Sequence, residues 1–217
     1  MGAFDYIKDP AEIYALSFER VRAATSLARF SPELAEVVIR VVHACGMPDA
    51  ADDILASPEA AAQAITALAG GAPVLADCAM VASGITKRFL HPDTSITMTL
   101  YDEATPARAK ALGTTRSAAA VEDWRRDIGG AVVAIGNAPT ALFHLLEKID
   151  DGWPKPAVIL AFPVGFVGAA ESKAALAERD DLDFITLSGT RGGSAMASAA
   201  VNAAALLAQK PRDEVSS

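Results

Sequence analysis

Hydrophobic residues recur with helical spacing in the first part of this chain. The positions i, i+3, i+4 and i+7 of a buried helical stripe are occupied by Leu34, Val37, Val38 and Val41. Ser31-Pro32-Glu33 precedes the stripe as a cap followed by proline at the first helical position. Gly46 follows it as a typical helix end. The pattern therefore predicts a helix that ends near Gly46.

Similar patterns predict further helices and short apolar strands along the rest of the chain. One further helix is predicted to begin at Asp9-Pro10. The others are predicted over 57–68, 106–112, 117–128, 139–149, 169–178 and 194–207. The predicted strands are 73–76, 95–100, 131–135, 157–161 and 184–187. Strands that alternate with helices indicate βαβ units. We expect an α/β fold with a mostly parallel sheet of about five strands and helices on both faces, preceded by N-terminal helices.

The chain shows neither an internal repeat nor a linker rich in proline, glycine or serine. We therefore expect one α/β domain over residues 1–208, followed by a polar C-terminal tail over 209–217.

Composition excludes several classes of protein. Hydrophobic residues make up 52% of the 217 residues and charged residues 21%, which is typical of a globular protein. The net charge of −8 and the lack of a basic stripe argue against a nucleic-acid partner. The start of the chain does not resemble a secretory signal, and the apolar stretch 195–208 is too short to span a membrane. We expect a cytoplasmic protein with no membrane partner.

The two cysteines, Cys45 and Cys78, indicate free thiols, because they support neither a disulfide framework nor a four-ligand zinc site. No metal site is predicted. The glycine-containing turns do not fit the spacing of a nucleotide-binding motif, so a nucleotide cofactor is poorly supported.

Polar residues gather where the predicted strands end. In parallel sheets, ligands bind beyond the carboxyl ends of the strands, where Asp77, Asn137 and Arg191 fall. The turns 136–140 and 189–194 each lead from a strand into a helix, so their N–H groups suit a phosphate or a carboxylate. The alternative is that their glycines only form tight turns.

His43 is the most distinctive candidate for chemistry, since imidazole exchanges protons near neutral pH and the chain has only three histidines. At about 100° per residue, it falls away from the buried stripe and beside Arg40 and Glu36. Spacing alone leaves two readings open, a functional polar patch or a solvated surface.

Longer motifs resemble one family. They are Asp9-Pro10 with Ile13-Tyr14 and Ser17-Phe18, the runs 42–46 (VHACG), 114–118 (TTRSA), 133–143 (VAIGNAPTALF), 163–173 (PVGFVGAAESK) and 191–195 (RGGSA), and Asp77 with Met80-Val81 and Gly84-Ile85. In this order they resemble the precorrin-8X methylmutases of cobalamin biosynthesis, from Tyr6 to about Leu207.

The resemblance implies an isomerase that moves a methyl group from C11 to C12 of precorrin-8X and forms hydrogenobyrinic acid, without a cofactor. His43 corresponds to the family's histidine, the proton donor and acceptor. The resemblance also implies an anionic tetrapyrrole-derived macrocycle as substrate, a homodimer, and handover of product to the next pathway enzyme. The substrate-binding residues it suggests are Tyr14, Ser17, Arg40, Thr86, Arg116, Ser117, Asn137, Arg191, Gly192, Gly193 and Ser194.

Two alternatives remain at this stage. One is the same methyl shift on cobalt-precorrin-8 in the anaerobic pathway, and the other is a corrinoid-binding or carrier protein without turnover.

Overall fold

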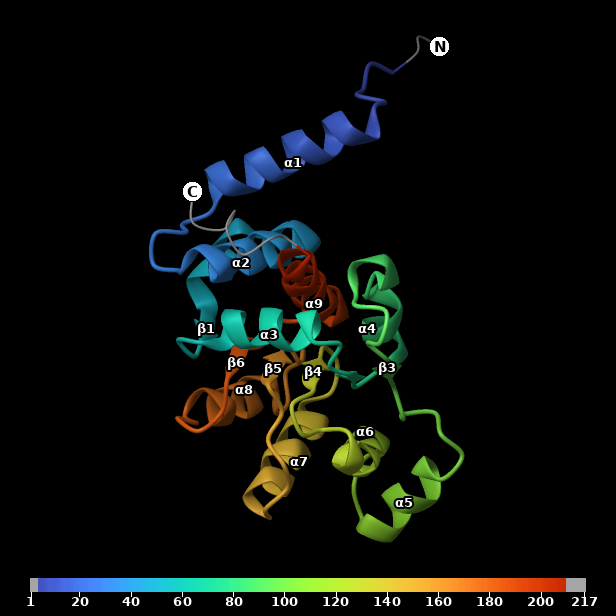
Figure 1. Cartoon of the computed structure of the whole chain (residues 1–217). Coiled ribbons are helices and arrows are strands. Elements are labelled where there is room, and N and C mark those ends of the chain that lie inside the picture. Colours follow the sequence, from blue (N-terminus) through green and yellow to red (C-terminus); the bar gives the residue numbers. More distant parts are fainter. Residues whose placement is uncertain (1–3, 210–217) are drawn as a thin grey trace.

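A six-stranded sheet lies between two layers of helices in the computed structural model, which describes residues 4–209 (Figure 1). The strands are β1 (Ile54–Ala56), β2 (Val74–Ala76), β3 (Ile96–Thr97), β4 (Val132–Ile135), β5 (Val158–Ala161) and β6 (Phe184–Leu187). Their order across the sheet is β1-β6-β5-β4-β2-β3. Strand β1 pairs with β6 antiparallel, and every other pair is parallel. The prediction of a mostly parallel α/β sheet is confirmed.

The number of strands was underestimated, because β1 was not predicted. This strand has three residues, too few for an alternating pattern to stand out in the sequence. It forms because β6 offers an unpaired edge, and the Ser188 N–H donates to the Asp53 carbonyl, 2.8 Å away, just before β1 begins.

The helices agree closely with the predicted ones. They are α1 (Pro10–Ala24), α2 (Pro32–Cys45), α3 (Ala60–Ala69), α4 (Ala79–Gly84), α5 (Thr105–Leu112), α6 (Arg116–Val121), α7 (Pro139–Asp150), α8 (Ala169–Ala177) and α9 (Ser194–Ala208). Short 3-10 segments are η1 (Pro48–Asp53), η2 (Lys87–Phe89) and η3 (Glu122–Arg126). Helix α4 was not predicted, and the helix expected over 117–128 is divided into α6 and η3. None of the helices among residues 4–209 is long and apolar enough to cross a membrane.

Local chemistry explains the ends of the first two helices. The Asp9 carboxylate accepts hydrogen bonds from the backbone N–H groups of Ala11 and Glu12 at the start of α1. Ser31 Oγ accepts the Leu34 N–H at the start of α2, and Gly46 ends that helix with a φ of 69°.

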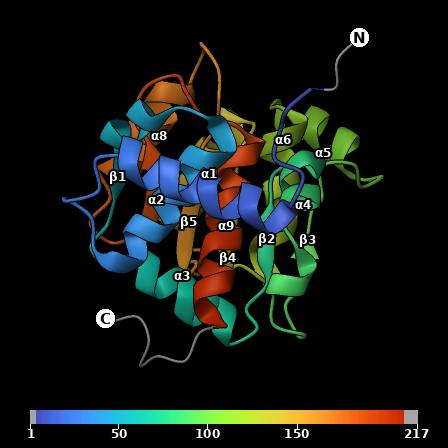
Figure 2. The same ribbon diagram turned by 90° about the horizontal axis from the view of Figure 1, so that it is seen from above.

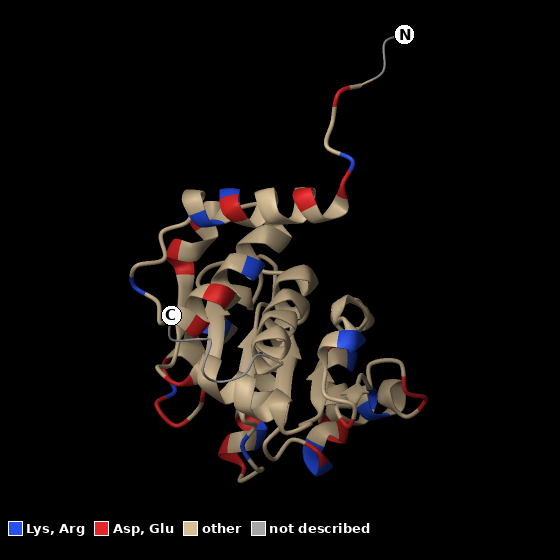
Figure 3. Ribbon diagram, turned by 45° about the horizontal axis from the view of Figure 1, so that its top comes forward, with Lys and Arg blue, Asp and Glu red and all other residues tan. Residues whose placement is uncertain are grey.

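Side chains from the strands alternate between two cores. In β4, Val132 and Ala134 pack with α2, α3 and α9, whereas Val133 and Ile135 pack with α6, α7 and α8 on the other face. Every residue of β4 is 0% exposed. Charged residues accordingly lie on the outer helices and loops and are absent from the central strands β4 and β5 (Figure 3).

Helix α1 lies outside this layered structure. It packs on the side of α2 that faces away from the sheet, and Figure 2 shows it lying across α2. No residue of α1 is buried. The expectation of a single domain over 1–208 with a polar tail over 209–217 stays a prediction, since residues 1–3 and 210–217 lie outside the described part of the chain.

A buried carboxylate joins the carboxyl ends of β2 and β4. Asp77 is 3% exposed, and its oxygens accept N–H groups of Gly136, Asn137 and Ala138 at 3.0, 2.9 and 2.9 Å. Burial raises the pKa of the Asp77 carboxyl, and the three N–H donors oppose that rise because they stabilise the carboxylate. Asp77 therefore satisfies the backbone of the turn that leads into α7.

We predict that Asp77→Asn lowers the free energy of unfolding by about 1–3 kcal/mol, because the amide NH₂ group would face N–H donors and leave one of them buried without an acceptor. Urea unfolding followed by circular dichroism measures the change. Asp127→Asn is the matched control, since Asp127 is exposed and its carboxylate makes no hydrogen bond within residues 4–209. Equal stability of the two variants would contradict this role of Asp77.

Candidate functional site

His43 lies on the surface at the C-terminal end of α2, facing α1. Its Nδ1 is 3.1 Å from the Ser17 hydroxyl, and its ring stacks on Phe18 with 4.5 Å between centroids and 19° between planes. The side chain is exposed, as expected for a residue outside the buried stripe. Because Ser17 and Phe18 hold one nitrogen and one face, Nε2 is the ring atom left for a ligand.

Phe18 is the centre of a small stack that the sequence did not single out as functional. The Tyr14 ring lies 4.6 Å from it, and the Arg40 guanidinium lies over it at 4.9 Å. In the sequence Phe18 appeared only as part of the Ser17-Phe18 motif of the family resemblance, and it was not predicted as a site residue. The signal for its role was its position next to Ser17, one turn after Tyr14.

Two hollows open on either side of His43. One of about 480 Å³ lies between α1 and the end of α2, and its lining includes Ile13, Ser17, Val42 and Gly46. The other, of about 210 Å³, is lined by Tyr14, Phe18, Arg40, His43, Ala44, Thr86, Phe89, Ala199 and Asn202. Five of the predicted site residues therefore lie together: Tyr14, Ser17, Arg40, His43 and Thr86.

Asn202 brings Thr86 to this place. Its side-chain oxygen accepts the Thr86 N–H at 2.8 Å, and its amide nitrogen donates to the Gly84 carbonyl at 2.9 Å. Helix α9 thus holds the segment between α4 and η2 against the second hollow. Asn202 was not predicted as a site residue, although it interrupts an otherwise small and apolar helix.

A second group of predicted residues lies where β4 ends. Thr115 caps α6 through the Ala118 N–H and contacts the Thr140 hydroxyl of α7 at 2.8 Å, so the turn that carries Arg116 adjoins the turn that carries Asn137. Arg116 and Asn137 are exposed, and Ser117 is half-buried. Within residues 4–209, none of these three side chains lines either hollow beside His43.

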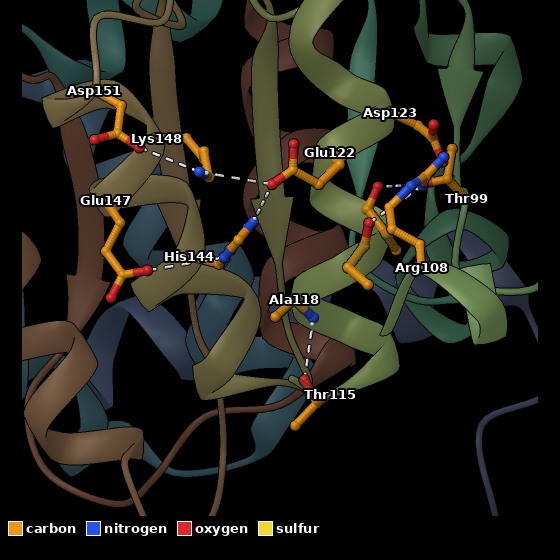
Figure 4. Close-up of polar contacts among 12 residues, drawn as sticks. Thr99, Arg108, Thr115, Ala118, Glu122, Asp123, His144, Glu147, Lys148 and Asp151 are labelled. Carbon is orange, nitrogen blue, oxygen red and sulfur yellow. Dashed lines mark hydrogen bonds and ion pairs between the residues drawn. The ribbon is translucent and has the colours of Figure 1, made fainter. Parts of the chain in front are cut away.

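Polar contacts of Glu122 hold η3 against α7, as Figure 4 shows. His144 Nε2 lies 2.7 Å from the Glu122 carboxylate, and Lys148 Nζ lies 3.8 Å from the same group. The His144 side chain is 13% exposed. This histidine therefore has a structural contact, and through Glu122 it helps to hold the segment that follows α6.

The predicted anion site at the turn 136–140 is already filled by the chain itself. The N–H groups expected to meet a ligand donate to the Asp77 carboxylate instead. The Asn137 N–H is therefore not free for a ligand, whereas the Asn137 side chain is exposed.

The turn 189–194 is held just as firmly. The Arg191 guanidinium pairs with the carboxylates of Asp49, at 2.7 Å, and Asp53. Carboxylates of the chain therefore already neutralise the charge expected to bind substrate. Gly192 has no room for a side chain, since a Cβ there would lie 2.6 Å from the Pro163 carbonyl. The Gly193 N–H donates to the Phe162 carbonyl at 2.8 Å, and the nearly buried Ser194 hydroxyl lies 3.5 Å from Cys78 Sγ.

Both cysteines are free thiols. The described residues contain no group of three or more His, Cys, Asp or Glu side chains arranged to hold a metal ion.

Comparison with known proteins identifies relatives along nearly the whole chain. A family model described as precorrin-8X methylmutase matches residues 12–207. The chain is 52% identical over 202 residues to the precorrin-8X methylmutase of Pseudomonas aeruginosa, covering 93% of this chain and 97% of the relative. It is 36% identical over 200 residues to the cobalt-precorrin-8 methylmutase of Priestia megaterium, covering 92% and 88%.

The fold agrees with this similarity. The crystal structure of the precorrin-8X methylmutase from Thermus thermophilus superposes with a TM-score of 0.82 at 33% identity, covering 90% of this chain and 96% of that one. From sequence and fold together, the chain belongs to the precorrin-8X methylmutase family.

Proposed function

We propose that this chain is the isomerase that moves a methyl group from C11 to C12 of precorrin-8X and forms hydrogenobyrinic acid. The observation that carries the proposal is the position of His43, exposed between two hollows with only Nδ1 engaged. A methyl migration within one molecule needs no external donor. The protein can therefore promote the reaction by binding the substrate, orienting it and transferring protons.

Ser17 suits a histidine that must both donate and accept a proton. A hydroxyl can donate to an unprotonated Nδ1 or accept from a protonated one, so the contact at 3.1 Å persists in either state. Phe18 holds the plane of the ring. His43 is thus oriented while Nε2 exchanges a proton with the macrocycle.

Arg40 and Arg116 are the arginines best placed to bind the substrate's carboxylates. Neither forms an ion pair with an acidic side chain of residues 4–209, whereas Arg191 is paired twice. Tyr14, Thr86, Ser117 and Asn137 are proposed as further polar contacts, and Gly192, Gly193 and Ser194 as residues whose backbone lines the site. Local positive charge of this kind can hold a polyanion on a protein whose net charge is −8.

The similarity to relatives favours the metal-free substrate over cobalt-precorrin-8. Identity is 52% to a precorrin-8X methylmutase and 36% to a cobalt-precorrin-8 methylmutase. Supplying each substrate separately distinguishes the two, and conversion of the cobalt form alone would select the anaerobic reaction. Binding without conversion of either would select the carrier.

We also propose a homodimer in which α1 supplies apolar contact surface. Ile7, just before α1, and Ile13 and Tyr14 within it are 37%, 47% and 51% exposed, and α1 packs on little besides α2. Exposed apolar side chains gathered on one element are typical of an interface. A cytoplasmic location and handover of product to the next pathway enzyme are further proposals, the second of which rests on the family resemblance.

His43→Ala should bind hydrogenobyrinic acid but lose at least about a hundredfold in the rate of methyl migration, the lower range for removing a general acid–base group. Visible spectroscopy follows the change of chromophore when precorrin-8X is supplied. His91→Ala is the control, because His91 lies outside both hollows and should leave the rate unchanged. Full activity of His43→Ala would refute the assigned role.

Arg40→Ala and Arg116→Ala should each raise the Kd for hydrogenobyrinic acid about tenfold, because each removes a charge-assisted hydrogen bond of about 1.5 kcal/mol. Spectroscopic titration measures the affinity. Arg126→Ala is the control, since this exposed arginine makes no side-chain hydrogen bond or ion pair within residues 4–209. Unchanged affinity would remove the tested arginine from the site.

Ile13→Asp should shift the protein from dimer toward monomer, because a carboxylate would be buried in an apolar contact. Light scattering coupled to size exclusion gives the mass. Leu112→Asp, at a similarly exposed leucine on α5, is the control and should leave the mass unchanged. A monomeric wild-type chain would contradict the proposed homodimer.

A further inference from the structure

Lys173 is a buried lysine with no place in the proposed proton transfer. It lies in α8 and is 1% exposed. Its Nζ donates to the main-chain carbonyl of Arg191, in the turn between β6 and α9. Burial lowers the pKa of Lys173 to about 8, although the nearby Asp53 carboxylate favours the charged form.

The turn that Lys173 contacts is tied to the segment that follows His43. The Arg191 guanidinium pairs with Asp49 and Asp53 of η1, which begins two residues after the glycine that ends α2. The Ser188 N–H donates to the Asp53 carbonyl at 2.8 Å, so the start of the same turn is joined to η1 as well. Lys173 thus holds the main chain of Arg191, while the side chain of Arg191 binds η1, the segment that follows α2.

Stability alone does not account for a lysine here. Removing an ammonium group from water is unfavourable, and an apolar side chain of similar length would avoid that cost. The turn itself needs an anchor, because Gly189 and Gly193 both have positive φ, at 75° and 138°, and glycine has the most backbone freedom to lose.

We propose that Lys173 is a positioning residue that holds the turn 189–193 at a fixed place relative to η1 and the end of α2. The turn contains Gly192 and Gly193 and leads into Ser194, three residues proposed above to line the substrate site. Lys173 would thereby fix the position of these residues relative to His43, because His43 lies near the end of α2 and η1 begins shortly after that helix. This inference rests on the proposed function.

Lys173→Met tests the proposal, because methionine keeps the length of the side chain and removes the donor. The expected result is a KM for precorrin-8X and a Kd for hydrogenobyrinic acid that both rise about tenfold, with kcat within about threefold of wild type. A role in folding alone would lower the amount of active enzyme, and hence kcat, without raising KM. Lys110→Met, at an exposed lysine of α5, is the control.

Asp53→Asn provides a second route if the first variant does not fold. It weakens the Arg191 contact from the opposite side, so the same rise in KM and Kd is expected. Where both single variants fold, the double variant should show less than the product of their effects, because both loosen one turn.

Failure of the inference is distinguishable from failure of the proposed function. An active wild type, with KM and Kd unchanged in Lys173→Met or in Asp53→Asn, would overturn the positioning role and leave the isomerase intact. A wild type that neither converts precorrin-8X nor binds hydrogenobyrinic acid would overturn both.

Discussion

Burial of the central parallel strands on both faces is the constraint on which the rest of this structure depends. All residues of β4 and β5 are 0% exposed, so each strand needs helices above and below it. The chain meets that need with helices that connect successive strands and with α2 and α9, which lie before the first strand and after the last. Helices α2, α3 and α9 fill one core, and α6, α7 and α8 fill the other. Polar chemistry is consequently displaced to the strand ends and to the outer helices.

At the strand ends, many of the polar groups bind other groups of the protein itself. Turns with free N–H groups resemble ligand sites, but one of them receives the Asp77 carboxylate and the other is held by Lys173 and by the carboxylates paired with Arg191. A buried N–H or charge must be satisfied whether or not a ligand is present. These internal partners make the turns rigid, and rigid turns can present exposed groups such as the Asn137 side chain at fixed positions.

His43 stands in a different place from the sheet edge that such folds commonly use for ligands. Its hollows are formed by α1, α2, the η2 segment and the middle of α9, on the side of one helical layer that faces away from the sheet. Arg116 and Asn137 lie at the carboxyl end of the sheet instead. A large macrocycle with several carboxylates is the kind of substrate for which separated groups of contacts are useful, because its reacting carbon and its acidic arms are far apart.

The sequence by itself determined the class of fold, most helices, five of the six strands and the surface position of His43, because these depend on periodic burial and on local caps such as Asp9, Ser31 and Gly46. Longer motifs also identified the family. Only the tertiary structure decided that β1 adds to the edge of β6, that Phe18 stacks on His43, and that Asn202 holds Thr86. It also showed that Asp77 accepts the N–H groups of the turn 136–140 and that Asp53 pairs with Arg191, groups that the sequence had assigned to a ligand. These contacts join residues 25 to more than 130 positions apart, and neither spacing nor propensity specifies which buried polar group a distant side chain will satisfy.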